Sequence, residues 1–275
     1  MTKLAGKVAL VSGSGRGIGA AIATKLASEG ARVVVNDIDP APAQDTVQAI
    51  AAAGGDAVAC VGDVTAPEFA PRFVATALDR YGALDIIVNN AGYAWDAVIQ
   101  KMTDEQWYAM LDVHATAPFR LLRAAAEPLR QLAKKEKDEG RVVQRKVVNV
   151  TSIAGLYGNA GQVAYAAGKA AVIGVTRTLA KEWGRYNVNV NAVAFGYIRT
   201  RMTEPIGESA TVAHIGERDV RMGVQPEMLA FMNRMIPLGR GGTVEEAAGA
   251  VYLFCIPESD YVSGQVVLAS GGFVM

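Results

Sequence analysis

Short runs of apolar, often β-branched residues alternate along the chain with longer stretches in which apolar residues recur at helical spacing. The longer stretches predict helices at 19–30, at 40–55 and around 67–81, and the first two end in glycine, as helices commonly do. The short runs predict strands at 7–13, 32–37, 57–64, 84–92, 146–152, 188–196 and 264–270. Strands that are apolar throughout and separated by helices are typical of a parallel sheet covered on both faces. The pattern therefore predicts the α/β class, with a doubly wound parallel sheet of about seven strands.

Two segments interrupt this alternation. Residues 133–146 form a charged run, which we expect to be a solvated connection before the fifth strand. Residues 201–236 form a long excursion with five methionines, and methionine suits a surface that adapts to an apolar ligand. A helical hairpin that packs its methionines into an oligomer contact is the alternative. Neither an internal repeat nor a linker divides the chain, so we expect a single domain over residues 1–275.

Composition narrows the classes of protein. Hydrophobic residues make up 51% of the chain and charged residues 20%, which provides for a large core and excludes a disordered chain. The 27 Lys and Arg residues balance 27 Asp and Glu residues, so no net charge attracts nucleic acid or an acidic membrane. The longest apolar run, 247–256, is too short to cross a bilayer, and no targeting segment is evident. We therefore expect a cytoplasmic protein, with Cys60 and Cys255 as reduced, buried thiols.

A glycine-rich turn follows the first predicted strand and precedes a helix. Glycines at 13, 15, 17 and 19 let the backbone turn tightly and approach a pyrophosphate, which can rest on the N-terminus of that helix. Asp37 ends the second strand, where an acid accepts hydrogen bonds from the adenosine ribose of NAD and repels the extra phosphate of NADP. Arg16, inside the turn, could instead pair with that phosphate. We expect a nicotinamide dinucleotide as cofactor, NAD by preference, with NADP as the alternative.

A stretch of small apolar residues, 163–174, contains one tyrosine and one lysine. On a helix their spacing of four places Tyr165 and Lys169 on one face. Taken alone, the pair is interpreted as a tyrosine at the edge of the core beside a solvated lysine. The remaining motifs change that interpretation.

The motifs together resemble the classical short-chain dehydrogenases/reductases over nearly the whole chain. The parts that carry the resemblance are "GSGRGIG" in the turn, "GDVT" at 62–65, "NNAG" at 89–92, Ser152 with Tyr165 and Lys169, "NAVAFGYIRT" at 191–200 and "VSGQVVLASGG" at 262–272. Among the members, the sequence looks most like the 3-oxoacyl-acyl-carrier-protein reductases. The resemblance implies a Rossmann-like fold and a set of cofactor-binding residues: Gly13, Arg16, Gly17, Ile18, Gly19, Asp37, Ile38, Asp63, Val64, Asn90, Ala91, Gly92, Tyr165, Lys169, Gly196, Ile198 and Thr200.

The resemblance also implies that Ser152, Tyr165 and Lys169 are catalytic. A free phenol has a pKa of about 10, too high for efficient acid–base work near neutrality. An ammonium from Lys169 and the positive nicotinamide ring would favour the phenolate and lower the pKa of Tyr165. Ser152 would hydrogen-bond the substrate oxygen, Tyr165 would donate the proton in reduction, and Lys169 would also bind the nicotinamide ribose.

Three positions depart from the family's pattern. His114 replaces the usual asparagine, which supports a water linking the catalytic lysine to solvent, and we add it to the catalytic candidates. The imidazole would either take over that support, adding a titration near neutral pH, or only pack while the backbone holds the water. Phe195 replaces a proline before Gly196 and offers an aromatic surface close to the nicotinamide or substrate. Gly168 replaces a serine, with little expected effect on the chemistry.

Aromatic and apolar residues follow the motifs and are candidates for substrate contact. With Ser152 they are Tyr93, Trp95, Leu156, Tyr157, Phe195 and Tyr197. Such a set favours a small-molecule substrate whose carbonyl is attached to an acyl chain or ring. We therefore expect a reductase of the 3-oxoacyl-thioester type, which transfers a hydride to that carbonyl. The alternatives are an NAD-dependent dehydrogenase of a secondary alcohol (hydroxyacyl-CoA, steroid or terpenoid) and a non-catalytic nicotinamide-binding sensor. The resemblance further implies a homotetramer or homodimer, with 247–256 and the last strand near one contact. No metal site is expected.

Overall fold

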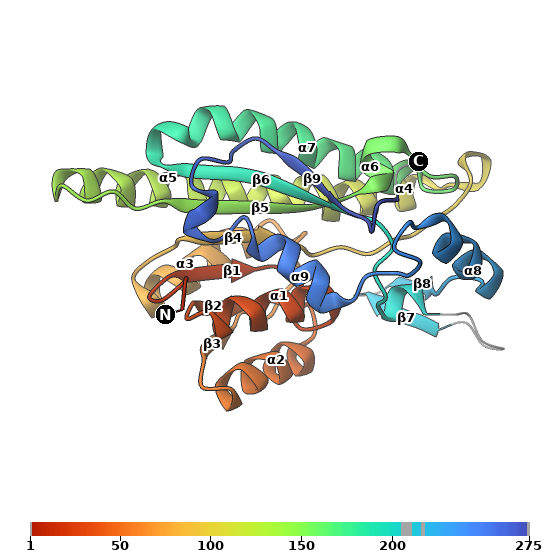
Figure 1. Cartoon of the computed structure of the whole chain (residues 1–275), viewed down its shortest axis with the longest axis horizontal. Coiled ribbons are helices and arrows are strands. Elements are labelled where there is room, and N and C mark those ends of the chain that lie inside the picture. The colour runs from red at the N-terminus through yellow and green to blue at the C-terminus, as the bar shows by residue number, and fades with distance from the viewer. Residues whose placement is uncertain (1, 205–210, 216–217, 274–275) are drawn as a thin grey trace.

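A parallel sheet of seven strands lies at the centre of the protein (Figure 1). The computed structural model describes residues 2–204, 211–215 and 218–273. Every neighbouring pair of strands in the sheet is parallel, which confirms the predicted doubly wound sheet. In spatial order the strands are β3 (Asp56–Ala59), β2 (Arg32–Val35), β1 (Val8–Val11), β4 (Ile86–Asn89), β5 (Arg145–Ser152), β6 (Val188–Phe195) and β9 (Val266–Ala269).

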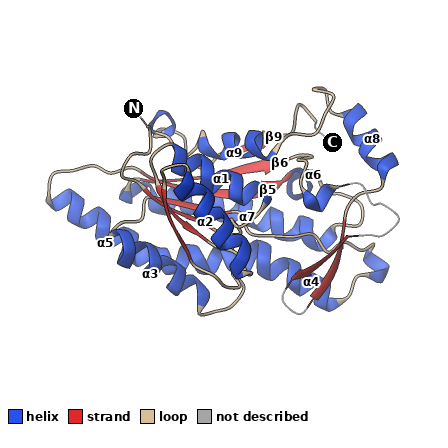
Figure 2. Cartoon of the chain, turned by 90° about the horizontal axis from the view of Figure 1, so that it is seen from below, coloured by secondary structure: helices blue, strands red, loops and turns tan. Residues whose placement is uncertain are grey.

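Helices cover both faces of the sheet (Figure 2). One face carries α1 (Gly17–Ser28), α2 (Pro40–Ala52) and α9 (Val244–Tyr252), and the other carries α3 (Phe69–Tyr81), α5 (Ala117–Asp138) and α7 (Val163–Trp183). In β1, Ala9 and Val11 belong to the first core, and Val8 and Leu10 belong to the second. Successive side chains of a strand point to opposite faces, and both faces are buried here. That is why the strands are apolar at every position.

The strand order reverses between β1 and β4, since the chain runs outward from β1 through β2 to β3 and then crosses back to β4. In open α/β sheets, ligands bind at such a reversal, outside the carboxyl ends of the strands. The glycine-rich turn lies there, between β1 and α1. The topology therefore marks the edge at which the predicted cofactor residues meet.

The charged run at 133–146 differs from the expected solvated connection. Helix α5 continues through it to Asp138. Glu136 is buried and accepts hydrogen bonds from Arg145 of β5, with Arg145 Nη1 to Glu136 Oε2 at 2.8 Å. Because each charge neutralises the other, both side chains leave water together. The expectation is wrong for this part of the run, which ties α5 to the start of β5.

The excursion at 201–236 contains strands as well as a helix. Strands β7 (Thr211–Ile215) and β8 (Arg218–Met222) pair antiparallel, and α8 (Pro226–Met235) follows them. The helical-hairpin alternative is therefore wrong for the described part of this segment, while residues 205–210 and 216–217 lie outside the described residues. Val220 of β8 is buried against a cluster that includes Tyr93 and Val113. The excursion thus packs onto the sheet edge where the site is expected.

Two further expectations concern thiols and membrane spans. Cys60 and Cys255 are both free and buried, as their apolar surroundings predicted. Among the helices in the described part of the chain, none combines the length and the apolar character needed to cross a membrane.

Candidate active site

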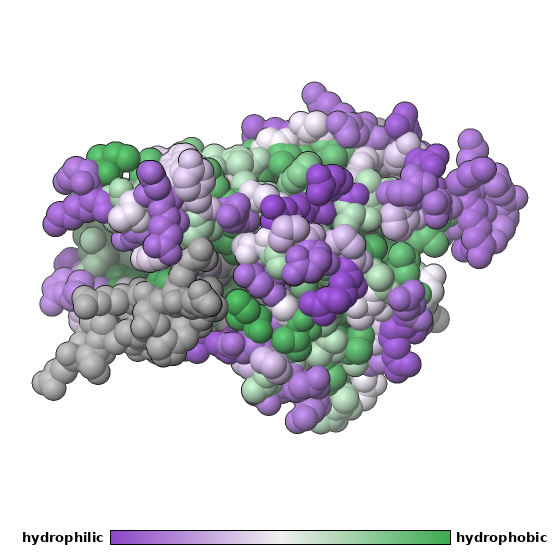
Figure 3. Space-filling view, turned by 180° about the vertical axis from the view of Figure 1, so that it is seen from behind, coloured by the Kyte–Doolittle hydropathy of each residue, from purple (hydrophilic) through white to green (hydrophobic). Residues whose placement is uncertain are grey.

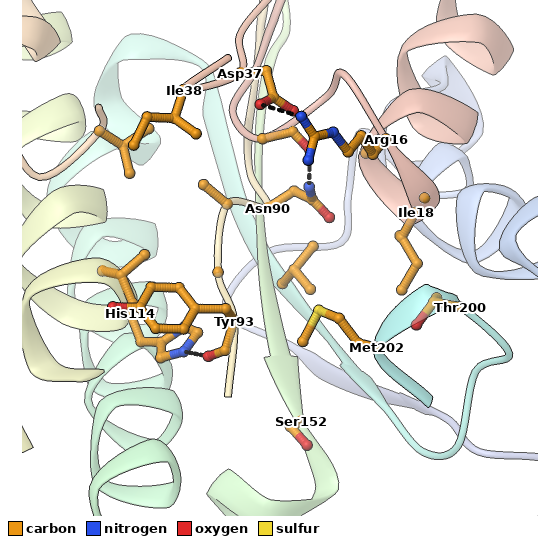
Figure 4. A pocket seen from close by; sticks show the side chains of 18 of the residues that line it. Arg16, Ile18, Asp37, Ile38, Asn90, Tyr93, His114, Ser152, Thr200 and Met202 are labelled. Carbon is orange, nitrogen blue, oxygen red and sulfur yellow. Dashed lines mark hydrogen bonds and ion pairs between the residues drawn. The ribbon is translucent and has the colours of Figure 1, made fainter. Parts of the chain in front are cut away.

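A cavity of about 770 Å³ opens at the carboxyl ends of β1, β2, β4, β5 and β6 (Figure 4), within the size range of small-molecule and cofactor sites. All seventeen residues predicted to bind the cofactor line it, and so do all four catalytic candidates. Sequence reasoning missed several lining residues, among them Asn36, Asp39, Gly62, Thr65, Glu105 and Val113. Arg201, Met202 and Thr203 also line the cavity and come from the excursion that was expected to adapt to an apolar ligand. The structure brings the candidates together around one cavity, and their individual roles stay predictions.

The glycine-rich turn forms one wall of the cavity. A Cβ on Gly19 would lie 2.0 Å from the carbonyl oxygen of Gly13, so no larger residue fits where the turn meets α1. Gly17 has φ +54° and open space where its Cβ would be, and it begins α1. The first backbone N–H groups of a helix have no partner within it and carry partial positive charge, which suits an anion. The turn therefore fits a dinucleotide pyrophosphate.

Asp37 lies at the adenosine end of the predicted cofactor site, directly after β2. Its side chain is only 11% exposed, and its Oδ1 accepts a hydrogen bond from the backbone N–H of Asp39 at 3.0 Å. A Cβ on Gly15 would lie 2.5 Å from Asp37 Oδ2, so the turn passes directly against this carboxylate. The carboxylate is thereby held beside the turn, at the place where the sequence predicted a ribose-binding acid.

Ser152, Tyr165 and Lys169 meet where β5, α6 (Ile153–Tyr157) and α7 come together. Ser152 ends β5 and caps α6, where its Oγ accepts from the backbone N–H of Ala154 at 3.2 Å. Lys169 is one helical turn beyond Tyr165, and its Nζ lies 5.8 Å from the centre of the tyrosine ring. The same Nζ donates to the carbonyl oxygen of Val150 at 2.9 Å. A hydroxyl, a phenol and an ammonium thus line one side of the cavity.

The acid–base properties of the pair differ from the expectation. Burial raises the pKa of Tyr165 to about 12, a nearby negative charge on Asp96 adds to the rise, and a hydrogen bond with Ser152 opposes it. The expected lowering is therefore wrong for the protein's own residues, because burial outweighs the groups that favour the phenolate. Burial also lowers the pKa of Lys169 to about 8. At neutral pH the phenol is protonated and the lysine is still mostly cationic.

His114 lies in a π-helical turn, η2 (Asp112–Thr116), and is buried. Its Nε2 donates to the carbonyl oxygen of Tyr93 at 2.7 Å, and its ring meets the ring of Tyr165 edge-on, with the centroids 4.9 Å apart. Burial and the charge of Lys169 hold the pKa of His114 well below its usual value, although the bond to Tyr93 works in the opposite direction. The imidazole is therefore neutral at physiological pH, and the expected titration near neutrality is wrong.

Replacing His114 by asparagine is expected to retain activity to within about tenfold, because an amide can also donate to the Tyr93 carbonyl and neither side chain is charged. The measurement is kcat/KM of both proteins across pH 6–9. His114→Leu is the contrasting variant, since it fills space without a donor and should lose more. A loss well over tenfold in His114→Asn, about 1.4 kcal/mol in the barrier, would show that the imidazole has a role that an amide cannot fill.

Gly168, which stands where the family has a serine, is next to His114 in space. A Cβ on Gly168 would lie 2.8 Å from His114 Cβ and 3.1 Å from the carbonyl oxygen of Met110. Helix α7 therefore approaches η2 too closely here for a serine. Gly92 supports the same arrangement, since its Cβ would lie 2.4 Å from His114 Cε1.

The predicted substrate residues divide into two groups. Tyr93, Ser152 and Phe195 line the cavity, and Met202 of the excursion joins them (Figure 4). Trp95 packs beside Tyr93 without reaching the lining. Leu156, Tyr157 and Tyr197 are not among the described residues that line this cavity: Tyr157 is 46% exposed, and the Tyr197 ring packs on Gly241. Their contact with substrate stays a prediction.

Comparisons with known proteins agree with this geometry. A family model described as short chain dehydrogenase matches residues 7–211. The 3-oxoacyl-[acyl-carrier-protein] reductase of Synechocystis is 39% identical over the full length of both chains. The reductase of the same name from Thermotoga maritima is 35% identical and covers 99% of this chain and 100% of its own.

Two solved structures share the fold. A putative gluconate dehydrogenase from Agrobacterium tumefaciens superposes with a TM-score of 0.83 at 30% identity, covering 99% of this chain and 97% of its own. A gluconate 5-dehydrogenase from Burkholderia cenocepacia, in complex with NADP and tartrate, gives a TM-score of 0.84 at 28% identity, covering 99% of this chain and 96% of its own.

Proposed function

The chain belongs to the short-chain dehydrogenase family, and from that premise we propose that it reduces a 3-oxoacyl thioester with a nicotinamide dinucleotide, NADH ahead of NADPH. Within the family's chemistry, it is a nicotinamide-dependent oxidoreductase that acts on a carbonyl or a secondary alcohol. The observation that carries the proposal is the convergence of Ser152, Tyr165 and Lys169 on the cavity that the glycine-rich turn also lines.

The cofactor supplies the hydride when it is bound. Ser152 holds the substrate carbonyl oxygen with its hydroxyl, so that the oxygen lies beside Tyr165. The Tyr165 phenol, whose pKa burial raises to about 12, keeps its proton at neutral pH and donates it to the oxygen as negative charge develops there. Lys169 then stabilises the phenolate that remains, because its ammonium stays close to the tyrosine ring.

The proposed substrate class rests on the apolar part of the cavity. Tyr93, Val113, Phe195 and Met202 line it, and Val220 belongs to the same buried cluster as Tyr93 and Val113. Apolar side chains of this kind stabilise an acyl chain by removing it from water. The names of the relatives from Synechocystis and Thermotoga maritima point to the same substrate class.

The preference for NADH rests on charge at the adenosine end. Asp37 is held beside the glycine-rich turn, and a carboxylate there repels the phosphate that distinguishes NADPH. Arg16 is the residue that would favour NADPH, and it already forms an ion pair with Asp39. The NADP in the Burkholderia cenocepacia structure belongs to a protein that is 28% identical, so it leaves the preference of this chain open to test.

The test is reduced-nicotinamide consumption by the purified protein with an acetoacetyl thioester. We expect kcat/KM with NADH to exceed that with NADPH by at least about tenfold, since like charges in an interface cost several kcal/mol. Turnover only with NADPH would contradict the cofactor preference. Turnover with secondary alcohols and NAD alone would support the dehydrogenase alternative, and cofactor binding without turnover on any carbonyl or alcohol would support the sensor alternative.

We also propose that the protein forms a homodimer or homotetramer through the β9 side of the sheet. Leu253 is 60% exposed and Val267 and Leu268 are 44% and 36% exposed, so an apolar surface lies beside this edge strand. Most of the run at 247–256 instead fills the protein's own core, since Ala247 and Val251 are buried. The buried, free Cys60 and Cys255 are consistent with the proposed cytoplasmic location.

A further inference from the structure

Three charged side chains lie together where the predicted adenosine ribose meets solvent. The Arg16 guanidinium forms an ion pair with the Asp39 carboxylate, and its Nη2 lies 4.0 Å from Asp37 Oδ1 (Figure 4). All three residues line the cavity. Asp37 is the acid that the sequence pointed to, whereas Asp39 was not a candidate for any role.

Asp39 occupies the N-cap position of α2 without acting as a cap. Its side chain makes no capping hydrogen bond, although aspartate is one of the preferred capping residues. The local sequence removes one of the two usual donors to a cap, because Pro42 at the third helical position has no backbone N–H. The carboxylate is therefore free of the helix and turns toward Arg16.

The pairing determines which groups a phosphate would meet. A 2′-phosphate on the ribose carries negative charge and needs a cation, and Arg16 is the residue in the turn that offers one. In this chain the guanidinium is balanced by Asp39 and approached by Asp37, so the three side chains together carry a net charge of −1. A phosphate would have to displace Asp39 from Arg16 and then remain close to both carboxylates.

We propose that Asp39 is a specificity-determining residue of the cofactor site, because its carboxylate holds Arg16 in an ion pair and so withholds this cation from the 2′-phosphate of NADP(H). The proposal rests on the proposed preference for NAD(H) and adds a second acid to Asp37. The two acids act differently. Asp37 faces the ribose itself, while Asp39 acts on the phosphate only through Arg16.

The test measures dissociation constants of NADH and NADPH by fluorescence titration, so it needs neither a substrate nor turnover. Asp39→Asn should bind NADPH about tenfold more tightly than the unmodified protein and NADH within about twofold, because the variant releases Arg16 and removes one repelling charge. The backbone N–H of residue 39 still reaches Asp37 in this variant, so the ribose acid stays in place. Asp138→Asn, at the exposed end of α5, is the matched control for an equal change in net charge.

A double variant separates release of Arg16 from simple removal of charge. Adding Arg16→Gln to Asp39→Asn should abolish the gain in NADPH affinity, and Arg16→Gln alone should give no gain, because it removes the cation and leaves both carboxylates. Melting temperatures establish that each variant is folded.

The outcomes distinguish this inference from the preference on which it rests. If the unmodified protein binds NADPH more tightly than NADH, the proposed preference fails, and the role of Asp39 fails with it. If the unmodified protein prefers NADH but Asp39→Asn binds NADPH no more tightly than Asp138→Asn does, only the role of Asp39 is overturned. If the gain in NADPH affinity persists when Arg16→Gln is added to Asp39→Asn, the gain does not come from release of Arg16, and the proposed role of Asp39 is overturned.

Discussion

Tyr165→Phe is expected to lower kcat for carbonyl reduction by about a thousandfold, within the range that a positioned general acid contributes. The phenylalanine ring keeps the edge-on contact with His114 but has no proton to give to the substrate oxygen. Cofactor binding should stay within about twofold, because the pyrophosphate and ribose sites in the glycine-rich turn and at Asp37 are untouched. Steady-state turnover of an acetoacetyl thioester and a fluorescence titration of NADH measure the two effects separately.

Tyr81→Phe is the matched control for that variant. Burial and the hydrogen bond to Asp56 raise the pKa of Tyr81 to about 12, much as burial raises the pKa of Tyr165, but Tyr81 ends α3 and does not line the cavity. Removing its hydroxyl should leave kcat unchanged. A Tyr165→Phe protein that keeps more than about a tenth of the turnover would show that another group supplies the proton.

Lys169→Met is expected to lower kcat/KM about a hundredfold, because the variant loses the ammonium that stabilises the phenolate left by proton transfer. Methionine fills the space of the lysine stem, so the loss reports on charge more than on packing. It also removes the donor to the Val150 carbonyl oxygen, which a melting temperature would report. Lys146→Met is the control for loss of a buried ammonium, since Lys146 bonds to Asn189 and Ser259 away from the cavity.

The pH dependence gives the Lys169 prediction a second readout. Burial lowers the pKa of Lys169 to about 8, so the ammonium is present below that pH and is lost as the pH rises through it. The contribution of Lys169 to kcat/KM should therefore decline above pH 8, because kcat/KM reports groups of the free enzyme. In Lys169→Met this decline should be absent. A wild-type profile that stays level from pH 7 to pH 10 would contradict the role of the ammonium.

The sequence alone was enough to predict the sheet and the location of its cofactor edge. β1 is buried on both faces, and a strand in that environment is apolar at every position, so its pattern is visible without any knowledge of its neighbours. The glycine-rich turn is similarly local, since the positive φ of Gly17 and the closest contact at Gly19, the carbonyl oxygen of Gly13, arise within the same turn. Such features can be predicted from the sequence because a few consecutive residues determine them.

The sequence was a poorer guide to the burial and contacts of residues that pack against segments far away along the chain. Glu136 belongs to a charged run, and only the approach of β5 explains why it is buried. Tyr157 follows the predicted catalytic serine in sequence, but it is 46% exposed and does not line the cavity. Spacing along the chain does not reveal such orientations, because they are set by packing between elements.

In the candidate site, short motifs were enough to identify the residues, whereas their protonation states and partners depend on the folded structure. The motifs identified Tyr165, Lys169, Asp37 and His114, because each occupies a recognisable position in a short stretch of sequence. Folding decided their acid–base states and partners, because it buries His114, partly buries Tyr165 and brings Asp39 to Arg16. The physical reason is that a pKa or an ion pair depends on burial and on charges within a few ångströms in space, and the segments that supply them are far apart along the chain.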